Sequence, residues 1–213
     1  MGHRGVIAWW ECHTCKQKFT GAMRTGLAEA WWARVRDAVE KNAEWQSAAY
    51  NLGQSLFGDG KYGEAERMFR EVHGIWMRLL GAEHTRTLSC AGEIALCLTC
   101  QGKHAKAEQI HREVLAVQKR VLGAEHPGTL NTASNLAVTL CGQHKYTEAQ
   151  PLFEATLEVQ RRVLGPAHPN TLHTASLLDQ MRSHMHVTQP AAAAGNATRG
   201  AARPLPAGTR VLV

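Results

Sequence analysis

Apolar residues recur through the middle of the chain at the three- and four-residue spacing of amphipathic helices. In the segment 129–164, one such stripe consists of Ala133, Leu136, Ala137 and Leu140. A second stripe consists of Ala149, Leu152, Phe153, Leu157, Val163 and Leu164. Only the short connection from Gly142 to His144 separates the two stripes. The pattern therefore predicts two antiparallel helices joined by a tight turn.

The same pattern returns every 42 residues, which marks a repeat architecture. The junction between pairs reads LGAEH at 80–84, LGAEHP at 122–127 and LGPAHP at 164–169. Glycine ends a helix at little steric cost, and proline suits the first turn of the next helix because its φ is fixed. The predicted helix pairs lie near residues 43–80, 87–122 and 129–164.

One helix pair of this size cannot cover its own apolar face, so neighbouring pairs must stack on it. Stacked pairs form a superhelix with one concave surface. The expected fold class is all-α, an α-solenoid of stacked antiparallel helix pairs. A last helix from about Thr171 to Ser183 is expected to close the array, because it would cover the apolar stripe of the third pair.

Four segments of the chain are therefore expected. Residues 1–19 form an N-terminal segment with a Cys-x-x-Cys pair, and residues 20–42 form a helix that caps the first pair. Residues 43–183 hold the three pairs and the closing helix. Residues 184–213 are rich in alanine, proline, glycine and arginine and lack the apolar content to order themselves, so they predict a disordered basic tail.

The residues of the repeat resemble a known family. AYNLGQ at 49–54, followed by GKYGEAE at 60–66, resembles a tetratricopeptide repeat almost residue for residue. Small residues at the first helix contact are Gly53, Ala95 and Ala137, and those at the second are Ala65, Ala107 and Ala149. The family's aromatic site holds Phe69, His111 and Phe153, so His111 departs from the pattern.

The 42-residue period and the LGxxHPxTL junction resemble the variant found in kinesin light chains, over about residues 43–183. This resemblance implies a tetratricopeptide-like superhelix that binds a partner peptide or helix in its concave groove. A kinesin-light-chain-like adaptor is a narrower form of that function. The long heptad region by which such light chains join the heavy chain is not visible in this sequence.

The first helix of each pair normally lines the concave face, which gives a candidate binding groove. Its residues are Tyr50, Asn51, Gln54, Phe57, Glu93, Leu96, Asn131, Asn135 and Val138. Asn51 and Asn135 match the inward asparagine of the family, whose amide can bond the backbone of an extended peptide. The alternative is that both amides bond neighbouring helices. A carboxylate at Glu93, in the middle of the groove, would oppose an acidic peptide.

A second candidate site is the pair Cys12 and Cys15. This spacing can supply two thiolates to zinc, but a structural zinc ion needs four ligands, so the pair is either half of a zinc module or inert. The zinc alternative makes the protein a zinc-module-plus-repeat adaptor or a ubiquitin-ligase-like fragment. His84, His126 and His168 recur at each junction, which predicts a structural bond in each loop rather than a shared metal.

Charge and motifs narrow the function classes. The net charge is +6, but the excess lies in the two ends and the repeat region is balanced, which argues against nucleic acid as the partner. The sequence has no bilayer-spanning stretch, no signal-peptide core, no catalytic constellation and no phosphate loop. We therefore expect a cytoplasmic protein that is not an enzyme, binds no membrane or small-molecule substrate, and needs no cofactor unless zinc binds.

Overall fold

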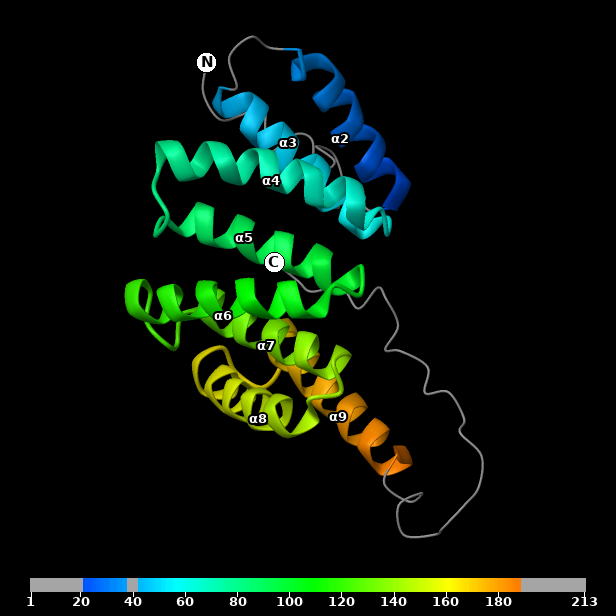
Figure 1. Cartoon of the computed structure of the whole chain (residues 1–213), viewed down its shortest axis with the longest axis vertical. Coiled ribbons are helices and arrows are strands. Elements are labelled where there is room, and N and C mark those ends of the chain that lie inside the picture. Colours follow the sequence, from blue (N-terminus) through cyan, green and yellow to red (C-terminus); the bar gives the residue numbers. More distant parts are fainter. Residues whose placement is uncertain (1–20, 38–41, 189–213) are drawn as a thin grey trace. The chain divides into compact units, whose positions relative to one another are not determined.

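The computed structural model describes residues 21–37 and 42–188, and within these ranges every regular element is a helix (Figure 1). The helices are α2 (Gly21–Val35), α3 (Ala43–Gly58), α4 (Tyr62–Leu79), α5 (Thr85–Cys100), α6 (His104–Val121), α7 (Pro127–Gly142), α8 (Tyr146–Val163) and α9 (Pro169–Thr188). Each of α4, α6 and α8 packs on the helix before it. The predicted all-α solenoid of helix pairs is confirmed.

The chain divides into two compact units, one ending at Ala82 and the other beginning at Glu83. In the first unit, α3 packs against both α2 and α4. The Arg24 guanidinium of α2 donates to the Gln54 carbonyl oxygen at 3.0 Å, and the Trp32 and Trp45 rings meet edge to face with centroids 5.1 Å apart. The side chains of Arg24 and Trp32 thus hold α2 along one side of α3.

The second unit contains α5 to α9. Besides the contacts within its two pairs, α6 packs on α7 and α8 packs on α9. Its core is built from small and branched apolar side chains of α6 to α9, with Ala137 and Ala149 fully buried where α7 meets α8. First helices also bond one another directly: Thr99 and Thr139 share a hydrogen bond of 2.9 Å, and Ser134 and Thr174 share one of 3.2 Å.

The junction sequence has a residue-by-residue explanation in the second unit. Gly123 and Gly165 close the preceding helices with φ of 93° and 92°, a left-handed conformation that favours glycine. The threonine six residues on then donates its hydroxyl hydrogen to the glycine carbonyl: Thr129 to Gly123 at 2.8 Å and Thr171 to Gly165 at 2.9 Å. The threonine therefore satisfies a carbonyl at the end of one helix from the first turn of the next.

The recurring histidines cap the first helices. The Nδ1 atom of each accepts a hydrogen bond from the backbone N–H two residues later: His84 from Arg86 at 3.1 Å, His126 from Gly128 at 3.1 Å and His168 from Asn170 at 3.2 Å. An imidazole thus takes the place that serine, threonine or aspartate usually holds at a helix N-terminus. The predicted structural bond in each loop is confirmed.

One ion pair ties each of the first two junction loops to the second helix of the following pair. The Arg120 guanidinium donates to both Glu83 carboxylate oxygens, at 2.6 and 3.2 Å, and Arg162 does the same to Glu125, at 2.6 and 3.4 Å. The hydrogen bond from the arginine lowers the pKa of each carboxyl group, and the arginine's charge acts in the same direction. The third junction has Ala167 at this position and lacks such a pair.

The last helix is longer than its sequence predicts. It was expected to end at Ser183, and residues from 184 onward were expected to be disordered, yet α9 continues to Thr188. The preceding first helices end at Gly58, Cys100 and Gly142, which correspond to position 184. Residues 184–187 read HMHV and contain no glycine or proline to stop the helix. The predictions for residues 1–19 and for 189–213 lie outside the described residues.

Candidate functional site

The predicted groove residues lie on α3, α5 and α7, and they differ in exposure. Those that are half-buried are Tyr50, Asn51, Gln54, Phe57, Asn131 and Val138. Those that are buried are Glu93, Leu96 and Asn135, with 7%, 6% and 8% of their surface exposed. The first unit thus offers more of this set to solvent than the second.

The two aromatic members of the set take part in the packing of the first helix pair. The Tyr50 ring contacts Phe69 edge to face with centroids 5.4 Å apart and lies 5.5 Å from the Trp76 ring. The Phe57 ring meets Tyr62 edge to face at 5.3 Å. Contacts with α4 therefore fix the positions of both rings.

The asparagines do not all behave alike. Asn131 Oδ1 accepts a hydrogen bond from Asn170 Nδ2 at 3.1 Å, so this amide joins α7 to α9. The side-chain amides of Asn51 and Asn135 make no hydrogen bond to any other described residue. The helix-bonding alternative thus holds for Asn131, whereas the two asparagines that match the inward position of the resemblance keep their hydrogen-bonding groups available.

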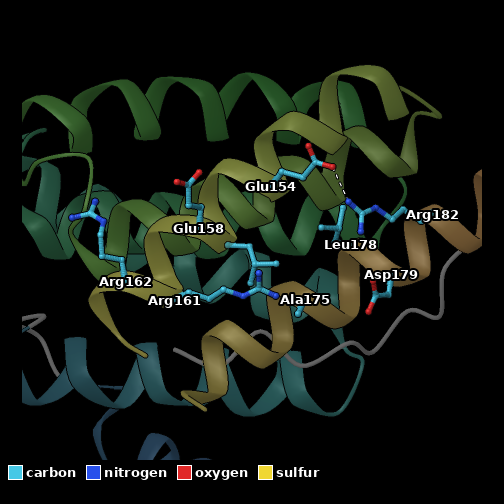
Figure 2. Close-up of a pocket in the computed structure, with 9 residues that line it drawn as sticks. Glu154, Glu158, Arg161, Arg162, Ala175, Leu178, Asp179 and Arg182 are labelled. Carbon is cyan, nitrogen blue, oxygen red and sulfur yellow. Dashed lines mark hydrogen bonds and ion pairs between the residues drawn. The ribbon is translucent and has the colours of Figure 1, made fainter. Parts of the chain in front are cut away.

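A groove lies between α8 and α9 of the second unit. It has a volume of about 600 Å³ and is open to solvent. Figure 2 shows its side chains, which are Glu154, Leu157, Glu158, Arg161, Arg162, Ala175, Leu178, Asp179 and Arg182. A shallower hollow continues over the outer side of α9, past Leu172 and Ser176.

The charges of this groove are only partly paired. Glu154 accepts a hydrogen bond from Arg182 at 2.8 Å (Figure 2), and Arg162 is held by Glu125 as described above. The hydrogen bond from Gln150, followed by that from Arg182, lowers the pKa of Glu154. The side-chain charges of Glu158, Arg161 and Asp179 form no ion pair with another described residue. The charge of Glu158 nevertheless acts on Arg162, so Asp179 and Arg161 are the charges of this groove that lack a partner among the described residues.

His111 is the most unusual buried residue of the second unit. It is fully buried, and neither ring nitrogen has a hydrogen-bond partner. Burial lowers the pKa of His111 to about 4, so the ring is neutral at pH 7. The sequence marked His111 as a departure from the aromatic site, but only the structure reveals that its nitrogens are unsatisfied.

A buried carboxylate connects the second pair to the third. Glu108, which is 5% exposed, receives hydrogen bonds from Lys145 Nζ at 2.9 Å and from Gln143 Nε2 at 2.6 Å, and it also pairs with Arg112. Burial alone would raise the pKa of Glu108, but these hydrogen bonds and the charges of Arg112 and Lys145 together lower it. The repeat alignment gave no indication of this contact, because glutamate at an exposed helix position would look the same.

The metal prediction concerns Cys12 and Cys15, which lie outside the described residues. Within residues 21–37 and 42–188, no three histidine, cysteine or acidic side chains are grouped so as to hold a metal ion. Cys90, Cys97, Cys100 and Cys141 form no disulfide with any described residue. Burial raises the pKa of Cys141 to about 12, which makes it a poor nucleophile. None of the helices in the described part of the chain is long and apolar enough to cross a membrane.

Comparison with known proteins supports the repeat assignment. Two family models, both described as tetratricopeptide repeat, match the chain, one over residues 45–120 and 91–141 and the other over 129–170. No curated protein matches the sequence.

Several solved structures share the fold. The nearly identical TPR-like repeats of a Podosopora anserina protein described as a kinesin light chain are 23% identical, with a TM-score of 0.61 over 78% of this chain and 80% of that one. A single-residue variant of that protein gives 23% identity and a TM-score of 0.62 over 78% and 79% of the two chains. BtubC (BKLC) from P. vanneervenii is 14% identical, with a TM-score of 0.58 over 86% and 79%.

Proposed function

Since this chain belongs to the tetratricopeptide repeat family, whose stacked helix pairs build binding surfaces, we propose that it is a non-enzymatic scaffold for a partner protein. The observation that carries the proposal is the stacking of repeated pairs, which presents first helices α5, α7 and α9 side by side in one unit. The expected ligand is an extended peptide or a helix of the partner.

The contacts proposed for this ligand follow from the available groups on the first helices. In each unit a first helix carries one amide that is unbonded within the described residues, Asn51 in the first unit and Asn135 in the second, and an amide can both donate to and accept from a peptide backbone. Val138 is half-buried on the same helix as Asn135 and would supply apolar contact.

The experiment uses the full chain as bait in a pull-down from cytosolic extract, with mass spectrometry of the retained proteins. A second bait carries Asn51→Ala and Asn135→Ala. A matched control carries Gln109→Ala and Gln150→Ala, two amides on second helices whose side chains bond only the glutamate four residues on. We expect partners that the native and control baits retain and the asparagine variant loses. Partners lost equally from both variants, or none at all, would contradict the proposed surface.

A narrower form of this function is an adaptor for a kinesin motor in the cytoplasm. Its support is the 42-residue repeat and the fold shared with repeats of a protein described as a kinesin light chain. Co-purification with a kinesin heavy chain tests it. The alternative with a zinc module at Cys12 and Cys15 is tested by the zinc content of the purified chain.

A further inference from the structure

The outer face of α9 differs from the same face of the earlier first helices. α5 packs against α6 and α7 packs against α8, and leucines at the equivalent positions of these first helices, Leu88 and Leu130, are 5% and 4% exposed. Leu172 holds this position in α9 and is 57% exposed. Within the described residues no second helix follows α9 to cover it.

Two residues of this face are charged where the earlier helices are apolar. Ala95 and Ala137 are fully buried, and Asp179 takes their position in α9 with its side chain exposed. Leu140, 2% exposed, is replaced by Arg182, which Glu154 of α8 already engages. Asp179 is thus a charge, without an ion-pair partner among the described residues, that an incoming helix would have to accommodate.

The first pair identifies what would meet Asp179. Gly53 has the same repeat position as Asp179, and a Cβ atom on Gly53 would come within 2.8 Å of the Phe69 ring. A helix packed on α9 in the same manner would therefore bring the residue at the Phe69 site against Asp179. A phenylalanine there would bury an unpaired carboxylate, whereas lysine or arginine would pair with it. Glu158 and Arg161 of α8 also line the groove and carry opposite charges.

The chain's own next segment does not fit this requirement. The earlier first helices end at a short turn that leads into a second helix, but α9 runs four residues past the equivalent position. In the 42-residue register, Gly195 stands at the Phe69 site, so that segment offers neither a ring nor a positive charge there. A separate molecule is the better occupant.

We propose that the α9 face, made of Leu172, Ala175 and Asp179 with the adjoining groove of α8, binds one amphipathic helix of a partner protein. That helix carries arginine or lysine at the site where α4 and α8 carry Phe69 and Phe153. Leu172 and Ala175 supply apolar contact, and Asp179 selects the basic residue. This surface is separate from the one proposed above, and neither depends on the other.

The repeats supply the probe. A fluorescent peptide with the sequence of α6, residues 104–121, carries the apolar and polar pattern of a second helix, and His111→Arg within it places a guanidinium at the position that would meet Asp179. The same peptide with His111→Glu is its matched control. In fluorescence anisotropy with the full chain, we expect the Arg peptide to bind about tenfold more tightly than the Glu peptide. In the variant Asp179→Lys this preference should reverse. Equal binding of both peptides, or a preference that Asp179→Lys leaves unchanged, would overturn the proposal.

Further variants test whether the peptide contacts Leu172 and whether the α9 face binds a separate partner, a second copy of the chain or the chain's own C-terminal segment. Leu172→Glu should weaken binding of the Arg peptide about tenfold, whereas Val121→Glu, at a residue 43% exposed on α6, should not. A dimer in sedimentation velocity that Asp179→Lys dissociates would overturn the proposal in favour of a second copy. A chain lacking residues 189–213 that binds the Arg peptide tenfold more tightly would overturn it in favour of the chain's own C-terminal segment.

Discussion

Gly53 of α3 lies directly against the ring of Phe69 in α4: a Cβ atom on Gly53 would come within 2.8 Å of Phe69 Cε1 and 3.0 Å of Cζ. Both residues are buried, and Phe69 is fully so. Ordinary carbon contacts are longer than this, so the ring would have to shift inside a packed core. Glycine is needed at this point for close approach of two helices rather than for an unusual backbone angle.

The first prediction compares two glycines of the first unit. Gly53→Ala should destabilise the protein by roughly 1 kcal/mol or more, because the clash with Phe69 exceeds the helix propensity gained. Gly74, within α4, has open space where its Cβ would stand, so Gly74→Ala should stabilise by up to about 1 kcal/mol. Chemical denaturation of the two variants measures the sign of each change in the free energy of unfolding. A stabilised Gly53→Ala variant would show that the ring moves freely.

The second prediction concerns the buried imidazole of His111. His111→Phe restores the ring of the first and third repeats and removes two unsatisfied nitrogens, so it should raise the free energy of unfolding by about 1 to 3 kcal/mol at pH 7. Thermal and urea unfolding measure it. The converse substitution Phe153→His, in the third pair, should destabilise by a similar amount. A less stable His111→Phe variant would mean that the pocket is shaped for imidazole.

The third prediction concerns how the free energy of unfolding depends on pH through His111. The pKa of His111 is lowered from 6.5 to about 4 by burial, so below pH 6.5 the unfolded chain binds a proton that the folded chain does not. Stability is therefore present above pH 6.5 and is lost as the pH falls toward 4. At pH 5 the loss from this group is about 2 kcal/mol. The stability gap between His111→Phe and the native chain should widen by that amount from pH 7 to pH 5, and a constant gap would contradict it.

The fourth prediction separates a buried ion pair from an exposed one. Lys145→Met removes a partner of the buried Glu108 carboxylate and should destabilise by about 1 to 3 kcal/mol, since the charge stays behind with fewer bonds. Arg120→Met breaks the exposed pair with Glu83 and should change stability little. Urea unfolding of both variants checks the order. An equal effect would show that water reaches Glu108 freely.

The fifth prediction tests the histidine caps. His126→Ala removes the Nδ1 acceptor of the Gly128 N–H and should cost about 0.5 to 2 kcal/mol, as loss of a helix N-cap generally does. His126→Asn keeps a side-chain acceptor at this position and should recover most of the loss. Melting temperatures of the native chain and the two variants test this order of stability. If asparagine is no better than alanine, the histidine acts by packing rather than by its hydrogen bond.

The candidate binding residues show which features of the site can be predicted from the sequence. Helical periodicity placed Tyr50, Asn131 and Asn135 on first helices, where the structure has them. It could not show which of these side chains already contact other residues of the protein. Asn131 bonds Asn170 of the next first helix and Tyr50 packs on Phe69, whereas the Asn135 amide bonds no described residue. These differences depend on contacts between residues far apart in the chain, and a repeat pattern averages over them.

The sequence by itself determined the helix pairs, their period and the junctions, because these follow from local effects: apolar spacing, a glycine that ends each second helix, and a histidine and threonine that bond within a few residues. Tertiary structure alone decided the rest. It left both nitrogens of His111 unsatisfied, buried Glu108 against Lys145 and exposed Leu172 beside Asp179. Each depends on which side chains meet across helices, and burial sets the energy of that contact.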